Sequence, residues 1–474
     1  MNTGAVNQWE QTKMTSENEP DKNTDANQHY NWQRQVDAGN LIGQLVESIA
    51  QTSGYVTTLR ETLMVQTGTR MVDWIDHLCF PADMMVDDKT IEAALLSVGF
   101  ELNHETDDGK WFQHNGGLFA PVCVSKDSTR RMVIQVESVA AFLSANEIDS
   151  EVIGVDGGQF RKALISDFRA LECWVCERHG WTKWEPCEST QVDVAAAAEV
   201  LEAFTKRPRE SFDDTLELIG DCVSKIGVDW ACDLFFAAER DYWQSRNLAA
   251  RVQKSRQDEL GLGWGNHDHH TYRNSRENFA ALIQCLEAMG FFCRERFYAG
   301  GQAGWGAQVL EQSNTGIVIF ADVDLSPEEL SGDFAHEGLE PQGTAGTVGL
   351  WCQLHGEAFL QAGMHHLECQ FDFDEARLQL AEEGIESMEP FTNFEYLRQA
   401  FTVGEIWQVD ADRIDAAQSK GDITAEQAAD FRANGAVGSH LEILERNDGF
   451  KGFNQTGVSE IIRKTDPRHI DLES

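Results

Sequence analysis

Positive charge is scarce in this sequence. Its 474 residues include 38 lysines and arginines against 79 aspartates and glutamates, which gives a formal net charge of −41 at pH 7. A nucleic acid or an anionic membrane requires a basic surface on its partner, so we expect the chain to bind neither. We interpret the excess of acidic side chains as a solvated surface.

Long apolar runs are also missing. The sequence contains no apolar stretch long enough for a transmembrane helix, which needs about 18 or more residues. The polar segment 1–28 lacks the apolar core of a secretory signal, and we therefore expect a cytoplasmic protein. Residues 1–38 have almost no aliphatic side chains and are expected to form a disordered acidic and polar tail.

The 11 cysteines follow no disulfide pattern, and an odd number scattered through a long chain is typical of reduced thiols. One cluster, Cys173-x-x-Cys176-x-x-His179 followed by Cys187, has ligand types that zinc accepts. The second ligand pair that is usual in zinc fingers is absent, and tryptophans crowd the segment. We interpret these cysteines as buried thiols.

The length predicts two or more domains, and one order of elements recurs along the chain. Residues 39–160 contain a helix over 41–63 and then a βαβββ-like module, whereas 161–255 show the periodicity of a helical connector. Residues 256–474 contain two further βαβββ passes, which begin at HDHHTYR and MHHLECQF. The passes share element order rather than residues, so the sequence predicts an α+β fold of repeated βαβββ modules with a helical connector.

A strand rich in histidine opens the first of these two C-terminal passes. Because side chains alternate along a strand, His269, Thr271 and Arg273 share one face of HDHHTYR. Four residues of strand span roughly 13 Å, so Arg273 cannot touch a metal bound by His269. Its long side chain could instead bind the far carboxylate of a small diacid held at that metal.

Two later strands offer the remaining ligands. His366 shares a face with Glu368 in MHHLECQF, and Glu442 shares a face with His440 in GSHLEILER. Two imidazoles and one carboxylate form the facial triad of non-haem Fe(II) oxygenases, which leaves three adjacent positions for substrate and dioxygen. We predict His269, His366 and Glu442 as metal ligands and Arg273 as a catalytic and substrate-binding residue. The other histidines of these strands are interpreted as bystanders or as hydrogen-bonding neighbours of the ligands: His267, His270 and His365.

The βαβββ order, with histidine on a first strand and glutamate on a last strand, resembles the vicinal oxygen chelate superfamily. Residues from about 211 to 465 resemble the 2-oxoadipate dioxygenase/decarboxylase family, formerly known only as a domain of unknown function. The matching positions are His269 followed by Arg273, His366 in HHL, and Glu442 in LEILERN. The run LRQAF also echoes the family, and Arg398 within it is a second candidate for binding the substrate.

This resemblance implies Fe(II), or another divalent metal, and a 2-oxo acid such as 2-oxoadipate chelated through its C1 carboxylate and keto oxygen. Arg273 would bind the distal carboxylate, and decarboxylation with insertion of oxygen would give a hydroxy acid and CO2. The sequence departs from the family pattern at His365, Leu441 and Asn447, where the family has Asn, Gly and Gly. The N-terminal half matches nothing in that family.

Two alternatives stay open. The first is a metal-dependent isomerase or lyase of the glyoxalase type, with Glu311 or Glu368 as the base, and dioxygen dependence separates it from the oxygenase. The second is a non-catalytic binding module. In the N-terminal module, His77 and Glu137 lie on an expected first and last strand, but two ligands are too few for a site. We expect that module to act as a scaffold or as the interface of a homodimer.

Overall fold

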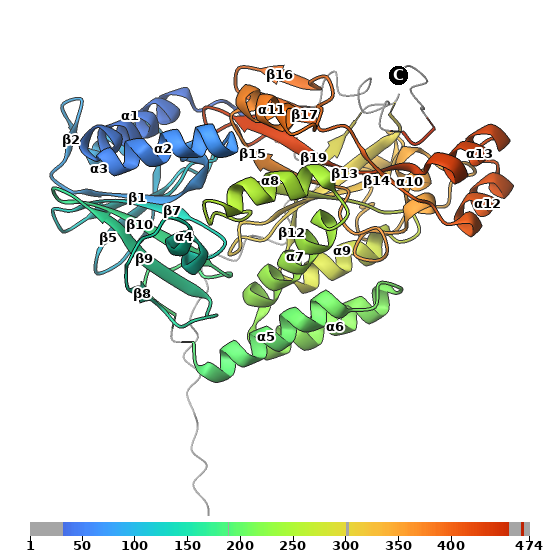
Figure 1. The fold of residues 1–474 in the computed structure, drawn as a ribbon, viewed down its shortest axis with the longest axis horizontal. Helices are drawn as coiled ribbons and strands as arrows, with labels where there is room; N and C mark the ends of the chain where they lie inside the picture. Colours follow the sequence, from blue (N-terminus) through green and yellow to red (C-terminus); the bar gives the residue numbers. More distant parts are fainter. Residues whose placement is uncertain (1–31, 188, 300–302, 455–465, 469–474) are drawn as a thin grey trace, which may run out of the picture.

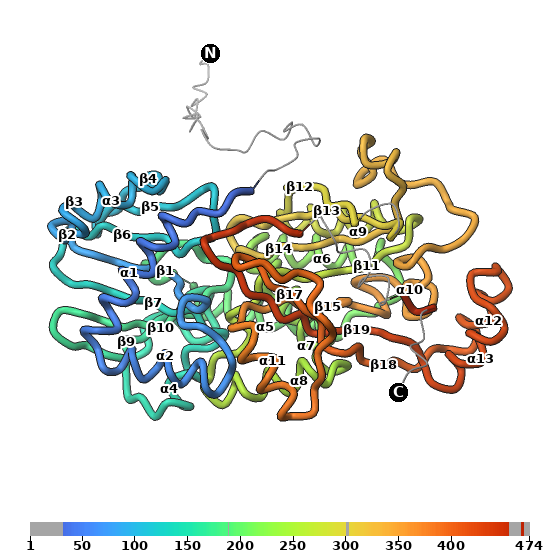
Figure 2. Tube along the Cα trace, turned by 90° about the horizontal axis from the view of Figure 1, so that it is seen from above, coloured from blue at the N-terminus to red at the C-terminus, as the bar shows by residue number. Residues whose placement is uncertain are grey.

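The computed structural model of the chain describes residues 32–187, 189–299, 303–454 and 466–468. Two large sheets, one of eight strands and one of nine, lie side by side along the long axis of the molecule (Figures 1 and 2). No helix within these residues combines the length and the apolar character needed to cross a bilayer. The predicted tail, residues 1–38, lies mostly outside the described residues, and helix α1 already begins at Val36.

The N-terminal sheet contains two βαβββ modules. Its strand order is β4-β5-β6-β1-β7-β10-β9-β8, so the first strands of the two modules pair antiparallel at its centre. The first module comprises β1 (Ile75–Pro81), the hairpin β2 (Met85–Val86) and β3 (Lys89–Thr90), α3 (Ile91–Ser97), β4 (Glu101–Glu105), β5 (Gly109–Gln113) and β6 (Val122–Ser125). The second comprises β7 (Arg130–Gln135), α4 (Val139–Ala145), β8 (Val152–Ile153), β9 (Phe160–Asp167) and β10 (Leu171–Arg178).

The C-terminal sheet repeats this plan, with the order β12-β13-β14-β11-β15-β19-β17-β16. Its first module comprises β11 (His267–Arg273), α9 (Phe279–Ala288), β12 (Phe292–Tyr298), β13 (Trp305–Glu311) and β14 (Val318–Asp324). After η2 (Glu329–Ser331) and α10 (Thr347–His355), the second comprises β15 (His366–Gln370), α11 (Phe373–Glu382), β16 (Thr392–Phe394), β17 (Leu397–Phe401) and β19 (Ala436–Arg446). The segment β18 (Glu405–Trp407), α12 (Ala411–Lys420) and α13 (Ala425–Asn434) is inserted before β19. The predicted fold class is therefore confirmed.

Helices precede and connect the sheets. Before β1 come α1 (Val36–Thr52), α2 (Gly54–Thr67) and η1 (Met71–Trp74); the connector comprises α5 (Gln191–Lys206), α6 (Phe212–Ile226), α7 (Val228–Gln244) and α8 (Leu248–Asp258). The single helix expected over 41–63 is divided in two, because Ser53 adopts an extended conformation and its hydroxyl accepts the amide of Val56 to start α2.

The N-terminal half differs from the sequence prediction in one further respect. The prediction of one module up to residue 160, followed by helix, is wrong for residues 160–178, which form β9 and β10. In β10 the side chains of Leu171, Cys173 and Val175 are buried at alternate positions, as in a strand with one face on the core. This period-two pattern covers only a few residues, and so short a run does not distinguish a strand from a helix by periodicity alone.

The two sheets are joined through the end of α2. Gly68 ends this helix with φ 65°, and its carbonyl accepts the amide of Asp372 at 2.9 Å just before α11. A Cβ atom at Gly68 would lie 2.8 Å from the Cα atom of Ala376, so only glycine permits this close approach. The end of α2 also contacts the helical connector, where Gln253 of α8 donates to the carbonyl of Thr67 at 3.0 Å.

Candidate metal centre

Three neighbouring strands of the C-terminal sheet carry a row of ionisable side chains. In the register of these strands, His269 on β11 lies opposite Glu368 on β15, and Glu368 lies beside Glu442 on β19. His366 lies two residues before Glu368, on the same face of β15. All four side chains are buried, so the pairing of strands brings them together inside the protein.

The Glu368 carboxylate lies between the two imidazoles. Its Oε1 atom is 2.8 Å from Nε2 of His269 and 2.7 Å from Nε2 of His366. Nε2 of His366 is also 3.5 Å from Oε2 of Glu442. Each of His366, Glu368 and Glu442 offers a ligand atom within 4.8 Å of the others. Imidazole nitrogens and carboxylate oxygens at this spacing can hold a divalent metal ion.

The ionisation of this cluster reflects crowded buried charge. Burial raises the pKa of Glu368, but the imidazoles of His269 and His366 outweigh it and bring that pKa down to about 2. Burial opposes protonation of His269, yet Glu368 and Asp268 raise its pKa to about 10. Burial and the Glu368 carboxylate raise the pKa of Glu442 well above its usual value. In the metal-free cluster, protons on His269 and Glu442 thus offset the negative charge of the carboxylates. A bound metal cation would displace these protons.

The ring of His269 is oriented by an acidic neighbour. Asp268 accepts from Nδ1 of His269 at 2.8 Å, which leaves Nε2 free to face the cluster. Asp268 is itself fixed by Arg446, whose Nε and Nη2 atoms lie 3.0 and 3.2 Å from its two oxygens, and by Gln370 at 3.0 Å. A carboxylate on the outer nitrogen of an imidazole is the usual support of a metal-binding histidine.

The other members of the cluster also have supporting contacts. Nδ1 of His365 and Nδ1 of His366 are 2.5 Å apart, so a hydrogen bond between the rings directs Nε2 of His366 to the cluster. Gln399 donates to Glu442 at 2.8 Å. The hydroxyl of Thr271 donates to Glu368 at 2.9 Å.

A small cavity of about 60 Å³ adjoins the cluster. Arg273 lines it from the end of β11, together with Phe320, Phe453 and other apolar side chains. The Nε and Nη1 atoms of Arg273 are buried and make no hydrogen bond within the described residues. Its nearest carboxylate, Asp322, lies 3.8 Å away, and burial raises the pKa of that group to about 8 even beside Arg273. Arg273 therefore has buried donors to offer a ligand.

The structure brings four of the predicted site residues together: His269, His366, Glu442 and Arg273. It also places Glu368 at the centre; the sequence predicts this residue as a candidate base of the isomerase alternative but not as a member of the ligand set. Arg398 is not part of the cavity, because on β17 it points to Asp374, which accepts two hydrogen bonds of 2.8 Å.

The candidate base Glu311 lies away from the cluster, as do His267 and His270, which we interpret from the sequence as bystanders or hydrogen-bonding neighbours. Glu311 accepts from Arg294 at 3.0 Å and does not line the cavity. His270 lies on the opposite face of β11, with Nε2 3.3 Å from Arg240. His267 lies at the start of the same strand, beside the ring of His270.

The N-terminal sheet carries a row in the same register with different side chains. His77 on β1 lies opposite Val133 on β7, and Val133 lies beside Trp174 on β10. Val133 thus corresponds to Glu368, and Trp174 corresponds to Glu442. Within the described residues, no three possible ligand side chains cluster around His77.

The aspartate and arginine that hold the ring of His269 nevertheless have counterparts beside His77. Nδ1 of His77 lies 2.5 Å from Asp76, and Arg178 binds Asp76 through Nε at 2.6 Å and Nη2 at 3.0 Å. Glu137 is not the partner that the sequence suggested, because it follows the first strand of the second module and pairs with Lys254 at 3.0 Å. A cleft of about 1400 Å³ reaches His77, but it contains no cluster of metal ligands among the described residues. We place the candidate centre in the smaller cavity for that reason.

No family model and no curated protein matches this sequence. Among solved structures, the chain is similar to a presumed hydrolase from Shewanella frigidimarina, with 14% identity over 48% of this chain and 98% of that one, at a TM-score of 0.34. It is also similar to a 4-hydroxymandelate synthase variant from Streptomyces coelicolor, with 10% identity, 70% and 96% coverage and a TM-score of 0.28. The Mn(II)-bound glyoxalase from Novosphingobium aromaticivorans has 10% identity, 81% and 86% coverage and a TM-score of 0.18. Scores this low carry no argument about the site, and the fold described above rests on the strand order of the chain itself.

Proposed function

We propose that this chain is a metal-dependent enzyme that acts on a small 2-oxo carboxylic acid. The observation that carries the proposal is the position of Arg273. Its Nε and Nη1 atoms, which make no hydrogen bond within the described residues, belong to a side chain that lines the same cavity as His269, His366, Glu368 and Glu442. A ligand that binds a metal at the cluster with one end and carries a carboxylate at the other end would accept hydrogen bonds from Arg273.

The donor set fits a divalent metal of the Fe(II), Mn(II) or Zn(II) type, which accepts imidazole and carboxylate ligands. His269, His366 and Glu442 would hold it, with Glu368 between the imidazoles as a fourth group. Such a metal supplies Lewis acidity toward a chelated keto carboxylate and, as Fe(II), the ability to activate dioxygen.

The protein residues have separable tasks. Arg273 positions the distal carboxylate, and a charge-assisted bond in so buried a place orients the substrate strongly. Glu368 and Thr271, joined by a hydrogen bond of 2.9 Å, can hold or move a proton beside the reacting carbon. Phe320 and Phe453 exclude water from the cavity.

Our leading version is an Fe(II)-dependent dioxygenase/decarboxylase that converts an acid such as 2-oxoadipate to a hydroxy acid and CO2, with the 2-oxo acid and O2 as its partners. It is supported by the predicted ligands His269, His366 and Glu442, all of which line one cavity. We further propose a cytoplasmic protein whose N-terminal sheet acts as a scaffold or as the interface of a homodimer.

A specific observation favours a second version. Glu368 lies within 2.8 Å of both imidazoles, and as a fourth protein ligand it would leave fewer open positions for dioxygen. A metal-dependent isomerase or lyase of the glyoxalase type needs only two such positions and a carboxylate base. The contacts of Glu368 with both imidazoles support it as that base, whereas Glu311 does not line the cavity.

Oxygen uptake by Fe(II)-reconstituted protein, measured with 2-oxoadipate and shorter 2-oxo acids, tests the proposal. We expect uptake with release of CO2, none with His269→Ala, and a raised KM for diacids but not for monoacids with Arg273→Met. Bound metal without oxygen uptake, together with isomerisation or cleavage that Glu368→Gln abolishes, would support the second version instead. A chain that binds no metal at this cluster would be the non-catalytic binding module.

A further inference from the structure

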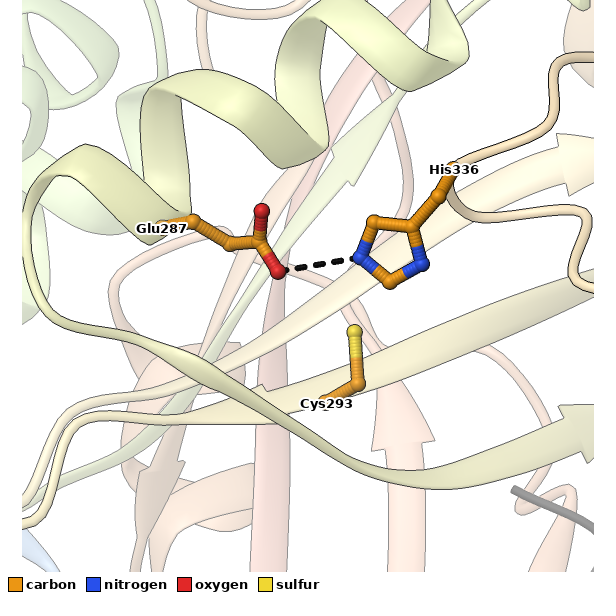
Figure 3. A group of neighbouring side chains, drawn as sticks. All are labelled: Glu287, Cys293 and His336. Atoms are coloured by element: carbon orange, nitrogen blue, oxygen red, sulfur yellow. Dashed lines mark hydrogen bonds and ion pairs between the residues drawn. The ribbon is translucent and has the colours of Figure 1, made fainter. Parts of the chain in front are cut away.

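A second group of metal-ligating side chains lies apart from the cavity. Glu287 is at the end of α9, Cys293 is at the start of β12, and His336 belongs to the segment between β14 and α10. Figure 3 shows the three side chains pointing toward one another from these three parts of the chain. This group could not be predicted from the sequence, because His336 is far along the chain from Glu287 and Cys293 and the three follow no ligand spacing.

We propose that Glu287, Cys293 and His336 form a metal site that takes Zn2+ or an ion of similar chemistry. Their ligand atoms all lie within 4.8 Å of one another, and Nε2 of His336 is 2.9 Å from Oε1 of Glu287. Donors bound tetrahedrally to zinc at 2.0–2.3 Å are roughly 3.3–3.8 Å apart. Small rotations of these side chains therefore suffice to surround an ion, with water or a further oxygen as the fourth ligand.

An independent observation is the support of His336. Both carboxylate oxygens of Asp333 lie 2.9 Å from its Nδ1, so the acid orients the ring and directs Nε2 at Glu287 and Cys293. This is the arrangement of a metal-binding histidine held by an outer carboxylate. The same arrangement supports His269 through Asp268.

The charge and the thiol also suit a soft divalent cation. Glu287 and Asp333 place two carboxylates at the site, and the nearest opposing charge is Arg296, with Nη2 3.8 Å from Asp333. Cys293 is only partly buried and makes no hydrogen bond within the described residues. A thiolate with imidazole and carboxylate is a ligand set typical of zinc.

An ion here would tie three parts of the fold together. It would fasten the connection between β14 and α10 to the end of α9 and the start of β12. That connection is also held by Arg276, which pairs with Glu329 and donates to the carbonyl of Glu340 at 2.7 Å, and by the buried side chain of Phe334. The site is therefore structural in character and does not depend on the proposed reaction.

Cobalt substitution tests the proposal with a signal that the first centre cannot produce. The cluster at His269 has only nitrogen and oxygen ligands, whereas Cys293 would give a thiolate-to-Co(II) charge-transfer absorption. We expect this band when Co(II) is added to the metal-free full chain, its loss in Cys293→Ser and His336→Gln, and its retention in His269→Ala. Zinc analysis should likewise show one equivalent fewer in Cys293→Ser than in the unchanged chain.

The matched control is Cys187→Ser, because Cys187 and Cys293 are the two cysteines that are not buried. This variant should keep both the band and the zinc. No thiolate band in the unchanged chain would overturn the proposal, as would a band that persists in Cys293→Ser. Because Cys293→Ser is a small change, circular dichroism is expected to show the same fold in both proteins, so that a lost band reports the lost ligand.

Discussion

The two sheets of this molecule have the same strand order, the same Asp-His pair on the first strand and the same arginine on the last strand. Among the described residues, however, a row of possible metal ligands lies only in the C-terminal sheet. Asp76 and Arg178 form the pair in the N-terminal sheet, and Asp268 and Arg446 form it in the C-terminal sheet. The Asp–Arg pair that orients a histidine is therefore also present in the sheet whose described residues show no cluster of metal ligands. In each sheet the pair links a first strand to a last strand, independently of what the histidine binds.

The surroundings of the two histidines explain the difference in charge. The ring of His77 is packed against Trp184 and Trp111, with centroids 4.7 and 4.9 Å away, and burial lowers its pKa. At His269, Glu368 and Asp268 overcome burial and raise the pKa to about 10. Apolar partners need no counter-ion, whereas buried carboxylates need protons or a cation. Within the described part of the chain, the C-terminal sheet therefore has a possible metal site and the N-terminal sheet does not.

The largest expected effect comes from removing the histidine in each sheet. His269→Ala should lower the affinity for metal at this centre by more than about 100-fold, since losing a ligand costs more than losing its outer support. His77→Ala should leave metal content unchanged. Titration with Fe(II) or Mn(II) under anaerobic conditions measures both. A loss of metal in His77→Ala would show that the N-terminal sheet also contributes to metal binding.

Removing the arginine of each pair should affect stability in both sheets. Arg446→Met removes one partner of a buried ion pair and leaves Asp268 with only His269 and Gln370, and breaking such a pair costs about 3–5 kcal/mol of unfolding free energy. Arg178→Met should cost somewhat less, because its side chain is 14% exposed against 4% for Arg446. Calorimetric unfolding of the two variants provides the measurement. Equal metal affinity in Arg446→Met and the unchanged chain would show that the pair acts on folding alone.

Replacing the aspartate of each pair by asparagine distinguishes its effect on the orientation of the histidine from its effect on the stability of the protein. Asp268→Asn should weaken metal binding by about 10- to 100-fold, the usual effect of losing the support of a ligand. Asp76→Asn removes the same contacts in the other sheet and should change stability without changing metal affinity. Dissociation constants for both variants would reveal the contrast, and identical constants would contradict it.

The smallest effect is spectroscopic. In metal-free protein at pH 7.5, His269 should be protonated, because its pKa is raised to about 10, whereas burial lowers the pKa of His77 and keeps it neutral. Imidazole 15N shifts report both states. Addition of metal should turn the signal of His269 into that of a neutral ring and leave His77 unmoved. Two neutral rings before metal is added would refute the assignment of charge.

Much of the fold and part of the centre could be predicted from the sequence. The strand HDHHTYR places His269 and Arg273 on one face by simple alternation, and the structure keeps them there. The central position of Glu368 could not be predicted, because it depends on the register between β11, β15 and β19. Register is set by pairing and packing across the sheet, which sequence periodicity alone does not specify.

The repetition in the N-terminal half was hidden for a related reason. Asp76 and His77 repeat Asp268 and His269, but two residues are too few to reveal a repeat. Trp174 at the position of Glu442 changes the chemical character of its strand, so the pattern of ligands that marks the C-terminal sheet is absent. Only the paired strands show that the two positions are equivalent.

The sequence separations of the two Asp–Arg pairs also predict an order of events during folding. Asp76 and Arg178 are 102 residues apart, whereas Asp268 and Arg446 are 178 residues apart. Closing the longer loop costs more chain entropy and takes longer. During synthesis on the ribosome, Asp76 and Arg178 would both have emerged well before β19. A partly synthesised chain would therefore contain His269 and His366 but not Glu442. The metal-binding half would thus mature last, beside a partner sheet that has already folded.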